Sequence, residues 1–330
     1  MVLRESNLLL GLFPRTAQEE IPTEVIRFTC PAEFEETVIA CIAHAASLHI
    51  PGRGNIYSKP VTTHVAEAPL YEYARLSSLQ RPKINMLTDL TGIHCIVQRD
   101  SANAIARAIL DMGLSVPTIV FGTGGGFRER LGLLRIAVPG AKETISLVLN
   151  RHDAEDAMEK LAEAARLDQP GKGLLYAHHL SRGVINTRFF IGKMKHIASI
   201  EQIIYAIDDI KGGNQWRTRA EQRKRRRHTH NAVMHDVTIY CNEDTVGGIL
   251  AAAMTAGAGG ATIYDMQFTS FTGRHDIFSP ARQMSNLIIR GELLEPVTRA
   301  ILDAGLLDPS VAGMLEISSV PMAFSYSGAR

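Results

Sequence analysis

Short runs rich in Val, Ile and Thr, typical of strands, alternate along this chain with Ala-rich stretches whose apolar residues recur every three or four positions, typical of helices. One such series runs through residues 96–121. A short strand leads to Asp100 and Ser101, which can cap a helix, and an amphipathic helix follows. Gly113 ends the helix and a second strand begins. The pattern therefore predicts a β-α-β series.

The same series returns later in the chain at a shift of 144 residues. The shift superposes Asp100 on Asp244, Ile105 on Ile249 and Gly113 on Gly257. Repeats at a fixed shift indicate repeated structural units, so the two series predict two copies of one fold.

The segments that follow these series also match, and they occur three times. A shift of 119 pairs Glu143 with Glu24, Glu155 with Glu36 and Tyr176 with Tyr57. A shift of 140 pairs Glu155 with Glu295, Ala164 with Ala304 and Gly173 with Gly313. The second half of the unit is thus present in three copies.

The repeats predict an α+β fold of tandem ferredoxin-like (βαββαβ) units. Two units are complete: the central unit (90–185) and the C-terminal unit (235–328). The N-terminal half unit (22–63) lacks a first half, and we interpret residues 187–218 as that missing half in permuted order. The alternative for 187–218 is a separate linker helix. Three units in one chain predict a pseudo-threefold arrangement, and two predict an oligomer, most simply a trimer.

A glycine-flanked basic residue recurs between the second helix and the last strand of the unit. Phosphate binding needs converging backbone N–H groups and a nearby cation, and glycine lets the backbone approach closely. The alternative is a tight turn in which glycine merely ends the helix. The candidates for the anion site are Gly171, Lys172 and Gly173, and in the N-terminal half unit Arg53.

A glycine-rich connection between the second and third strands and a Gly-basic-Gly turn before the fourth strand resemble the PII family of nitrogen-signalling proteins. The resemblance is best over 90–185 and implies a ferredoxin-like fold, a trimer and a nucleotide site between subunits. In its terms Lys142 matches the phosphate-contacting lysine, and 170–174 matches the phosphate-binding "B-loop". Gly122 and Gly124 lie at the base of the partner-binding "T-loop" (122–138).

The chain also departs from the family pattern. Gly126 stands where the family's 2-oxoglutarate and Mg²⁺ site has a glutamine, and residues 122–138 contain no tyrosine to modify. The C-terminal unit has Ser-Val-Ala-Gly at 310–313 in place of the basic turn. Its site is therefore expected to be inactive or different in specificity, and ATP or ADP is the cofactor that the resemblance implies.

Composition adds limits to this picture. Apolar residues make up 45% of the chain and the formal net charge is +1, so a packed core is expected, but not a surface that coats nucleic acid. No apolar stretch is long enough to predict a membrane span. Four cysteines without a CxxC pair predict reduced thiols in a cytoplasmic protein.

One basic linker (214–234) stands out from this balance. Its charges are too dense for a packed helix: Arg217, Arg219, Arg223, Lys224, Arg225, Arg226 and Arg227. It fits a solvated connector or an arm for an anionic partner. Because aromatic residues are almost absent from it, nucleic acid is a disfavoured partner.

Taken together, the sequence predicts a regulatory protein that binds a small anionic effector, with adenine nucleotide favoured. It would signal to a partner protein through loops 122–138 and 214–234. The alternative is an enzyme or enzyme accessory acting on a small metabolite in clefts between units. We find no nucleophile motif, no HExxH and no metal-ligand cluster, so catalysis is disfavoured and no metal is predicted. His178 with His179, and His228 with His230, are the histidines that could bind a metal, but the arginines beside His228 and His230 oppose a dication.

Overall fold

A computed structural model describes residues 24–50, 53–65, 77–112, 114–125, 140–185, 233–267 and 281–325. The predicted half unit 187–218, most of loop 122–138 and nearly all of linker 214–234 lie outside these residues. No helix within the described ranges is long and apolar enough to cross a membrane.

The central unit is a ferredoxin-like fold. Its elements are β3 (Leu90–Gln98), α3 (Ala102–Asp111), β4 (Thr118–Gly125), β5 (Ala141–Asn150), α4 (Ala154–Ala164) and β6 (Gly173–Leu180). The strands pair in the order β6-β3-β5-β4, all antiparallel. This order places the first and third strands of the unit in the middle of the sheet, as the repeat predicted.

The C-terminal unit repeats this arrangement. Its elements are β8 (Met234–Asn242), α7 (Glu243–Thr255), β9 (Ala261–Met266), β10 (Arg282–Arg290), α8 (Leu294–Asp303) and β11 (Met314–Val320). The strand order is β9-β10-β8-β11. The α+β, tandem ferredoxin-like prediction is therefore confirmed.

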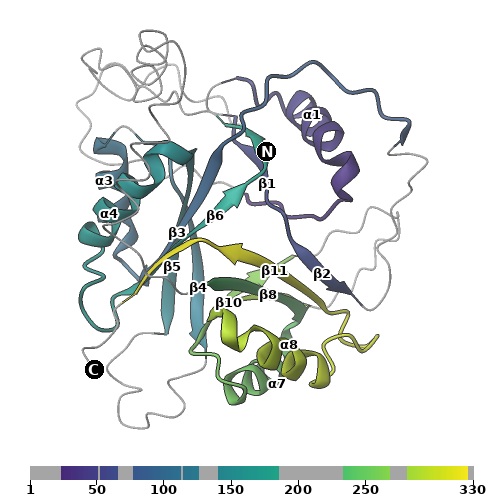
Figure 1. Ribbon diagram of the computed structural model, residues 1–330, viewed down its shortest axis with the longest axis vertical. Helices are drawn as coiled ribbons and strands as arrows, with labels where there is room; N and C mark the ends of the chain where they lie inside the picture. Colours follow the sequence, from purple (N-terminus) through teal and green to yellow (C-terminus); the bar gives the residue numbers. More distant parts are fainter. Residues whose placement is uncertain are drawn as a thin grey trace.

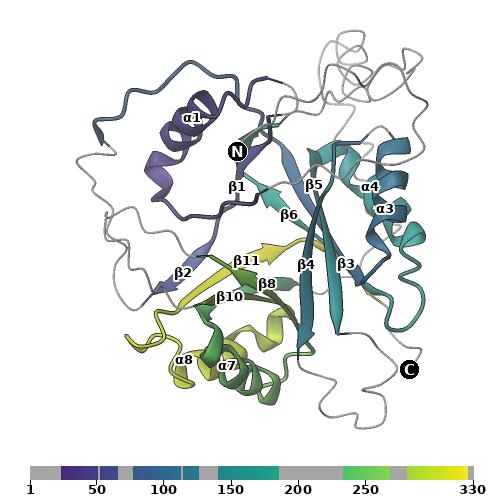
Figure 2. The ribbon, with the colours of Figure 1, turned by 180° about the vertical axis from the view of Figure 1, so that it is seen from behind.

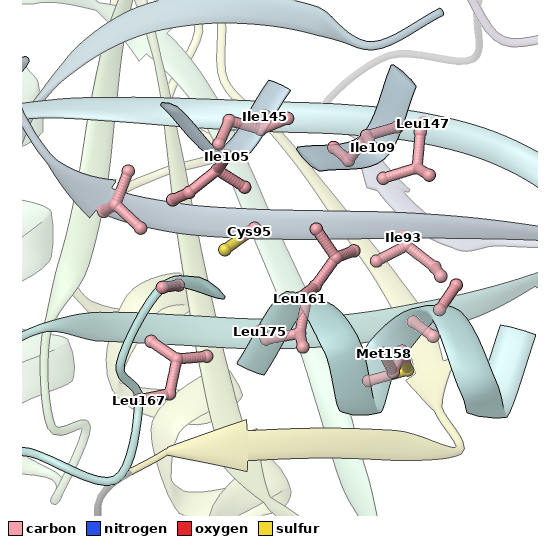
Figure 3. Packing of buried hydrophobic residues seen from close by; sticks show 14 of the residues in the cluster. Ile93, Cys95, Ile105, Ile109, Ile145, Leu147, Met158, Leu161, Leu167 and Leu175 are labelled. Atoms are coloured by element: carbon pink, nitrogen blue, oxygen red, sulfur yellow. The ribbon is translucent and has the colours of Figure 1, made fainter. Parts of the chain in front are cut away.

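Both cores form where the apolar side of a sheet meets its two helices. In the central unit, the alternate β3 residues Ile93 and Cys95 point towards α3 and α4 (Figure 3). Val97, the next alternate residue, belongs to the same cluster. They meet Ile105, Ile109, Met158 and Leu161, which recur at helical spacing and are at most 3% exposed. The C-terminal unit has a matching core.

The N-terminal part contributes three described elements: α1 (Glu35–Ala45), β1 (Ile56–Ser58) and β2 (Thr62–Val65). The helix packs Ile39 and Ala43 against Leu48. Residues 24–30, which the repeat predicts as a strand, are not in a strand. The partner that such a strand would need is the first half of the unit, and the segment that we interpret as that half, 187–218, lies outside the described residues.

The two complete units join edge to edge, and short strands then link all three parts. The edge strands β4 and β9 pair at Thr123 with Ile263, Gly124 with Thr262 and Gly125 with Ala261. The resulting ten-stranded sheet runs from β12 (Met322–Ser325) to β2. In both ribbon views the strands lie at the centre and the helices of the three parts lie outside (Figures 1 and 2).

Three strand exchanges close these links into a ring. β12 follows β11 and pairs with β6; β7 (Arg182–Val184) follows β6 and pairs with β1; and β2 follows β1 and pairs with β11. Each part thus gives one strand to the next, from C-terminal unit to central unit to N-terminal part and back. This cyclic order is the pseudo-threefold arrangement expected from the repeats.

Candidate functional site

The predicted anion-site residues of the central unit gather at one end of its sheet. Lys142, the second residue of β5, pairs with Gly122 on β4 and with Gln98 on β3. Its Cε lies 3.3 Å from the point where a Cβ on Gly124 would stand. The lysine side chain therefore lies across the glycine-containing end of β4.

The turn before β6 lies on the other side of Gln98. The Gln98 side-chain amide donates a hydrogen bond to the Gly171 carbonyl at 3.1 Å, and Val97 pairs with Gly173. Gln98 thus lies between Lys142 and the turn that carries Lys172. Six of the seven predicted site residues share this end of the sheet.

Arg53 does not join them. It belongs to the N-terminal part, is exposed, and donates its backbone N–H to Ile50. It corresponds to Lys172 by the repeat, so it marks the equivalent turn of another unit and not a component of the Lys142 site.

The base of loop 122–138 lies directly against the C-terminal unit. A Cβ on Gly122 would stand 2.8 Å from the Ile263 carbonyl oxygen and 3.0 Å from the Tyr264 ring, both on β9. Close by, Thr144 Oγ1 and Tyr264 Oη share a 2.6 Å hydrogen bond. The candidate site is therefore at a junction of two units, a place where a bound group could change how they meet.

The N-terminus of α3, next to this site, is already occupied by a carboxylate of the protein. Glu143 is 6% exposed, and its Oε2 accepts the backbone N–H groups of Ser101 at 3.1 Å and Ala102 at 2.8 Å. An exogenous anion would have to displace it. We therefore place the anion at Lys142 and the 171–173 turn, and not at α3.

We expect Glu143→Ala to lower the free energy of unfolding by about 1–3 kcal/mol, because the buried N–H of Ala102 and the partly buried N–H of Ser101 lose a charged acceptor. Glu143→Gln keeps one acceptor oxygen and should lower the free energy of unfolding by less than Glu143→Ala. Urea unfolding measures both, with the exposed Glu159→Ala as the control. A loss in Glu143→Ala no greater than in Glu159→Ala would contradict this role.

Sequence reasoning missed Arg282, the counterpart of Lys142 at the shift of 140. The Arg282 guanidinium donates to the Ala312 carbonyl, and Asn242 Nδ2 donates to the Ser310 carbonyl at 3.0 Å. The C-terminal unit thus keeps a cation at this position, but the cation bonds its own turn. The same 140-residue shift could have identified it.

A second polar group, which we call the axial cluster, lies where the three parts meet: Lys59, His178, Asp236, Asn286 and Ser318. By the shifts of 119 and 140, Lys59, His178 and Ser318 hold the same position in three different parts. The cluster is therefore a polar contact among all three parts.

Asp236 is the centre of the axial cluster and is only 3% exposed. Its Oδ2 lies 3.0 Å from Lys59 Nζ and 3.1 Å from His178 Nε2. Its Oδ1 accepts hydrogen bonds from Thr238 at 2.9 Å and from Asn286. Burial alone would raise the pKa of Asp236, but the Lys59 ammonium and the His178 ring outweigh burial and hold the pKa well below its usual range.

The rings next to the cluster pack on one another. His94 stacks on Tyr176 at 5.2 Å between centroids, and His178 lies edge-on to both at 5.3 Å. Burial lowers the pKa of His94 well below its usual value, with a further contribution from His178. His179 is exposed while His178 is buried, so these two neighbours face opposite sides of β6 and do not form a joint metal site.

No protein-family model matches this sequence, and no curated protein matches it. Solved structures do match. PII from Arabidopsis thaliana, bound to citrate, is 18% identical and covers 28% of this chain and 79% of its own, with a TM-score of 0.23. The regulatory subunit of aspartate kinase from Thermus flavus is 14% identical and covers 67% and 95%, with a TM-score of 0.24.

Aspartate kinase from Synechocystis is 8% identical and covers 71% of this chain and 44% of its own, with a TM-score of 0.21. Because all three TM-scores are below 0.5, the fold assignment stands on the strand order and register of this chain.

Proposed function

We propose that this protein is a PII-like regulatory protein that binds a small anionic effector at the Lys142 end of the central unit. Adenine nucleotide is the favoured effector. Effector binding would be signalled to a partner protein through loops 122–138 and 214–234. Lys142, Lys172 and the glycines beside them are the residues that we assign to the effector.

The observation that carries this proposal is the position of Lys142 across Gly124, with the Lys172 turn held next to it by Gln98. Two lysines close to a glycine-lined backbone supply the charge and the close approach that a phosphate group needs. The contact of Gly122 with β9 gives a route by which an effector could alter the joint between two units.

Isothermal titration of the full chain with ATP, ADP, AMP and citrate tests the proposal; citrate is included because the matching PII structure holds it. We expect Lys142→Ala to weaken binding about tenfold or more, the effect of losing one charge-assisted hydrogen bond. Lys172→Ala should weaken it as well. Lys160→Ala, on the exposed face of α4, is the matched control and should bind normally.

Two results would count against the proposal in different ways. Binding of citrate but of none of the nucleotides would exclude adenine nucleotide as the effector and would still support an anion site. Failure of all four ligands to bind, or equal affinities in Lys142→Ala and Lys160→Ala, would remove the site itself.

The alternative, an enzyme acting between units, draws on the axial cluster, whose titratable groups do converge. Both carboxylate oxygens of Asp236, however, already have two partners each, and the carboxylate is almost fully buried. We therefore assign the axial cluster to holding the three parts together.

A further inference from the structure

A groove of about 500 Å³ lies beside α8 in the C-terminal unit, and none of the residues assigned to the effector lines it. Its walls include Leu294, Thr298, Leu302 and Ile317, and Glu295 and Arg299 stand at its rim as an exposed ion pair. In Figure 1, α8 lies at the lower edge of the molecule, close to β11 and β2. The groove is thus mostly apolar inside and charged at its mouth.

The same corner of the central unit is filled by β12. Met322 pairs with Ala177 and Phe324 pairs with Leu175, and both side chains pack against the core beneath α4. Directly opposed residues of an antiparallel pair point to the same face of the sheet. The side chains of Met322 and Phe324 therefore lie on the same face as those of Ala177 and Leu175.

In the C-terminal unit the corresponding strand is β2. The shift of 140 carries Ala177 to Ile317 and Leu175 to Leu315, whose partners on β2 are Thr62 and His64. Met322 and Phe324 are therefore replaced by a small hydroxyl residue and an imidazole. The edge strand therefore brings less apolar side chain to this corner than β12 does.

On the helix side the exchanges go in both directions. Met158 on α4 is fully buried, and its counterpart on α8 is Thr298. The Thr298 hydroxyl is buried and has no hydrogen-bond partner among the described residues. The groove thus lacks the side chains of Met158, Met322 and Phe324. Its walls are apolar because Leu294, Leu302 and Ile317 replace the alanines Ala154, Ala162 and Ala177.

The strand beside the groove has an unpaired edge. β2 is the last strand of the ten-stranded sheet, and no described residue pairs with its outer side. A free edge offers backbone donors and acceptors to an extended segment, and alternate side chains of such a segment point to one face.

We propose that the groove and the outer edge of β2 together bind an extended segment of a partner protein with large apolar residues at alternate positions. The Met-Ala-Phe of residues 322–324, which fills the equivalent corner, defines the chemistry of that segment. Its backbone adds to β2, and its apolar side chains reach over Thr62 into the groove lined by Leu294, Thr298 and Ile317. This proposal does not depend on the proposed function.

The probe is a labelled peptide with the sequence of residues 319–327, Ser-Val-Pro-Met-Ala-Phe-Ser-Tyr-Ser, measured against the full chain by fluorescence polarisation. We expect saturable binding, weakened roughly tenfold or more by Thr298→Met, which restores the side chain of the central unit. Thr62→Met, at an exposed position, should have the same effect without risk to the core. A peptide with serine in place of Met and Phe should not bind.

Thermal unfolding followed by circular dichroism verifies that both variants are folded. Absence of peptide binding, or binding that neither variant weakens, would overturn the proposal. So would a concentration-dependent dimer of the native chain that Thr62→Met abolishes, because the groove would then serve a second copy.

Discussion

Replacing Asp236 with Ala should lower the free energy of unfolding by about 3–5 kcal/mol, the cost of breaking a buried ion pair by removing one partner. Four groups from three parts of the chain donate to this carboxylate, and without it the Lys59 ammonium loses the carboxylate that lies 3.0 Å away. Chemical unfolding in urea measures the loss. Asp111→Ala, at an exposed helix end, is the control and should stay within about 0.5 kcal/mol of the native chain.

Two further measurements separate this explanation from a general loss of packing. Lys59→Met introduced into Asp236→Ala should recover part of the stability, because the unpaired cation is removed with its partner. The second measurement is the pH dependence. Since the folded-state pKa of Asp236 is depressed, its contribution is present at neutral pH and is lost as pH falls below about 3.9, the value of an unfolded Asp.

The gap in stability between the native chain and Asp236→Ala should therefore narrow in acid. A gap that is the same at pH 7 and pH 3, or a double variant as unstable as the sum of its parts, would contradict the ion-pair explanation.

Gly173→Ala should lower the free energy of unfolding by about 3 kcal/mol or more, whereas Gly171→Ala, two residues away, should lower it by about 1 kcal/mol. Both glycines have positive φ, +154° and +74°. A Cβ on Gly173 would stand 2.1 Å from the Ile96 carbonyl oxygen in a paired strand, while a Cβ on Gly171 would meet nothing within 4 Å. The difference therefore measures close approach and not backbone conformation alone.

Urea midpoints of the two variants test this pair. Effector affinity adds a second result, because Gly171→Ala should fold and still bind if the anion is held by Lys142 and Lys172. Equal losses of stability in the two variants would show that the close contact between position 173 and the Ile96 carbonyl oxygen is not what requires glycine there.

The two complete units could be predicted from the sequence because their information is local and repeated. Each helix has its own apolar period, and the fixed shift between Asp100 and Asp244 repeats it. The gathering of Lys142 with Gly122 and Gly171 also followed, since strand order in a ferredoxin-like unit brings those ends together.

The strand exchanges could not be predicted in the same way. β1 and β7 have three residues each and β2 has four, too few to show a period, and their partners lie far away in the chain. Thr62 pairs with Ile317, and nothing near Thr62 indicates that position. Such pairings are decided by tertiary packing.

The axial cluster lies between these two cases. Asp236 looks like an ordinary polar residue at the start of a strand, and its partners come from two other parts of the chain. The shifts of 119 and 140 did place Lys59, His178 and Ser318 at one equivalent position. Combining that equivalence with a threefold axis would have brought them together, but a carboxylate from β8 had no counterpart, because Gly92 holds its place in the central unit.

The ring of strand exchanges also sets the order in which the chain can fold. The central unit contains all four of its own strands within residues 90–180, so we expect it to form early. β2 emerges from the ribosome long before β11, its partner, and β12 comes last of all. β2 must therefore wait for β11 until synthesis is nearly complete, whereas β1 finds β7 midway. We expect the final closure of the ring to be the slow step of folding.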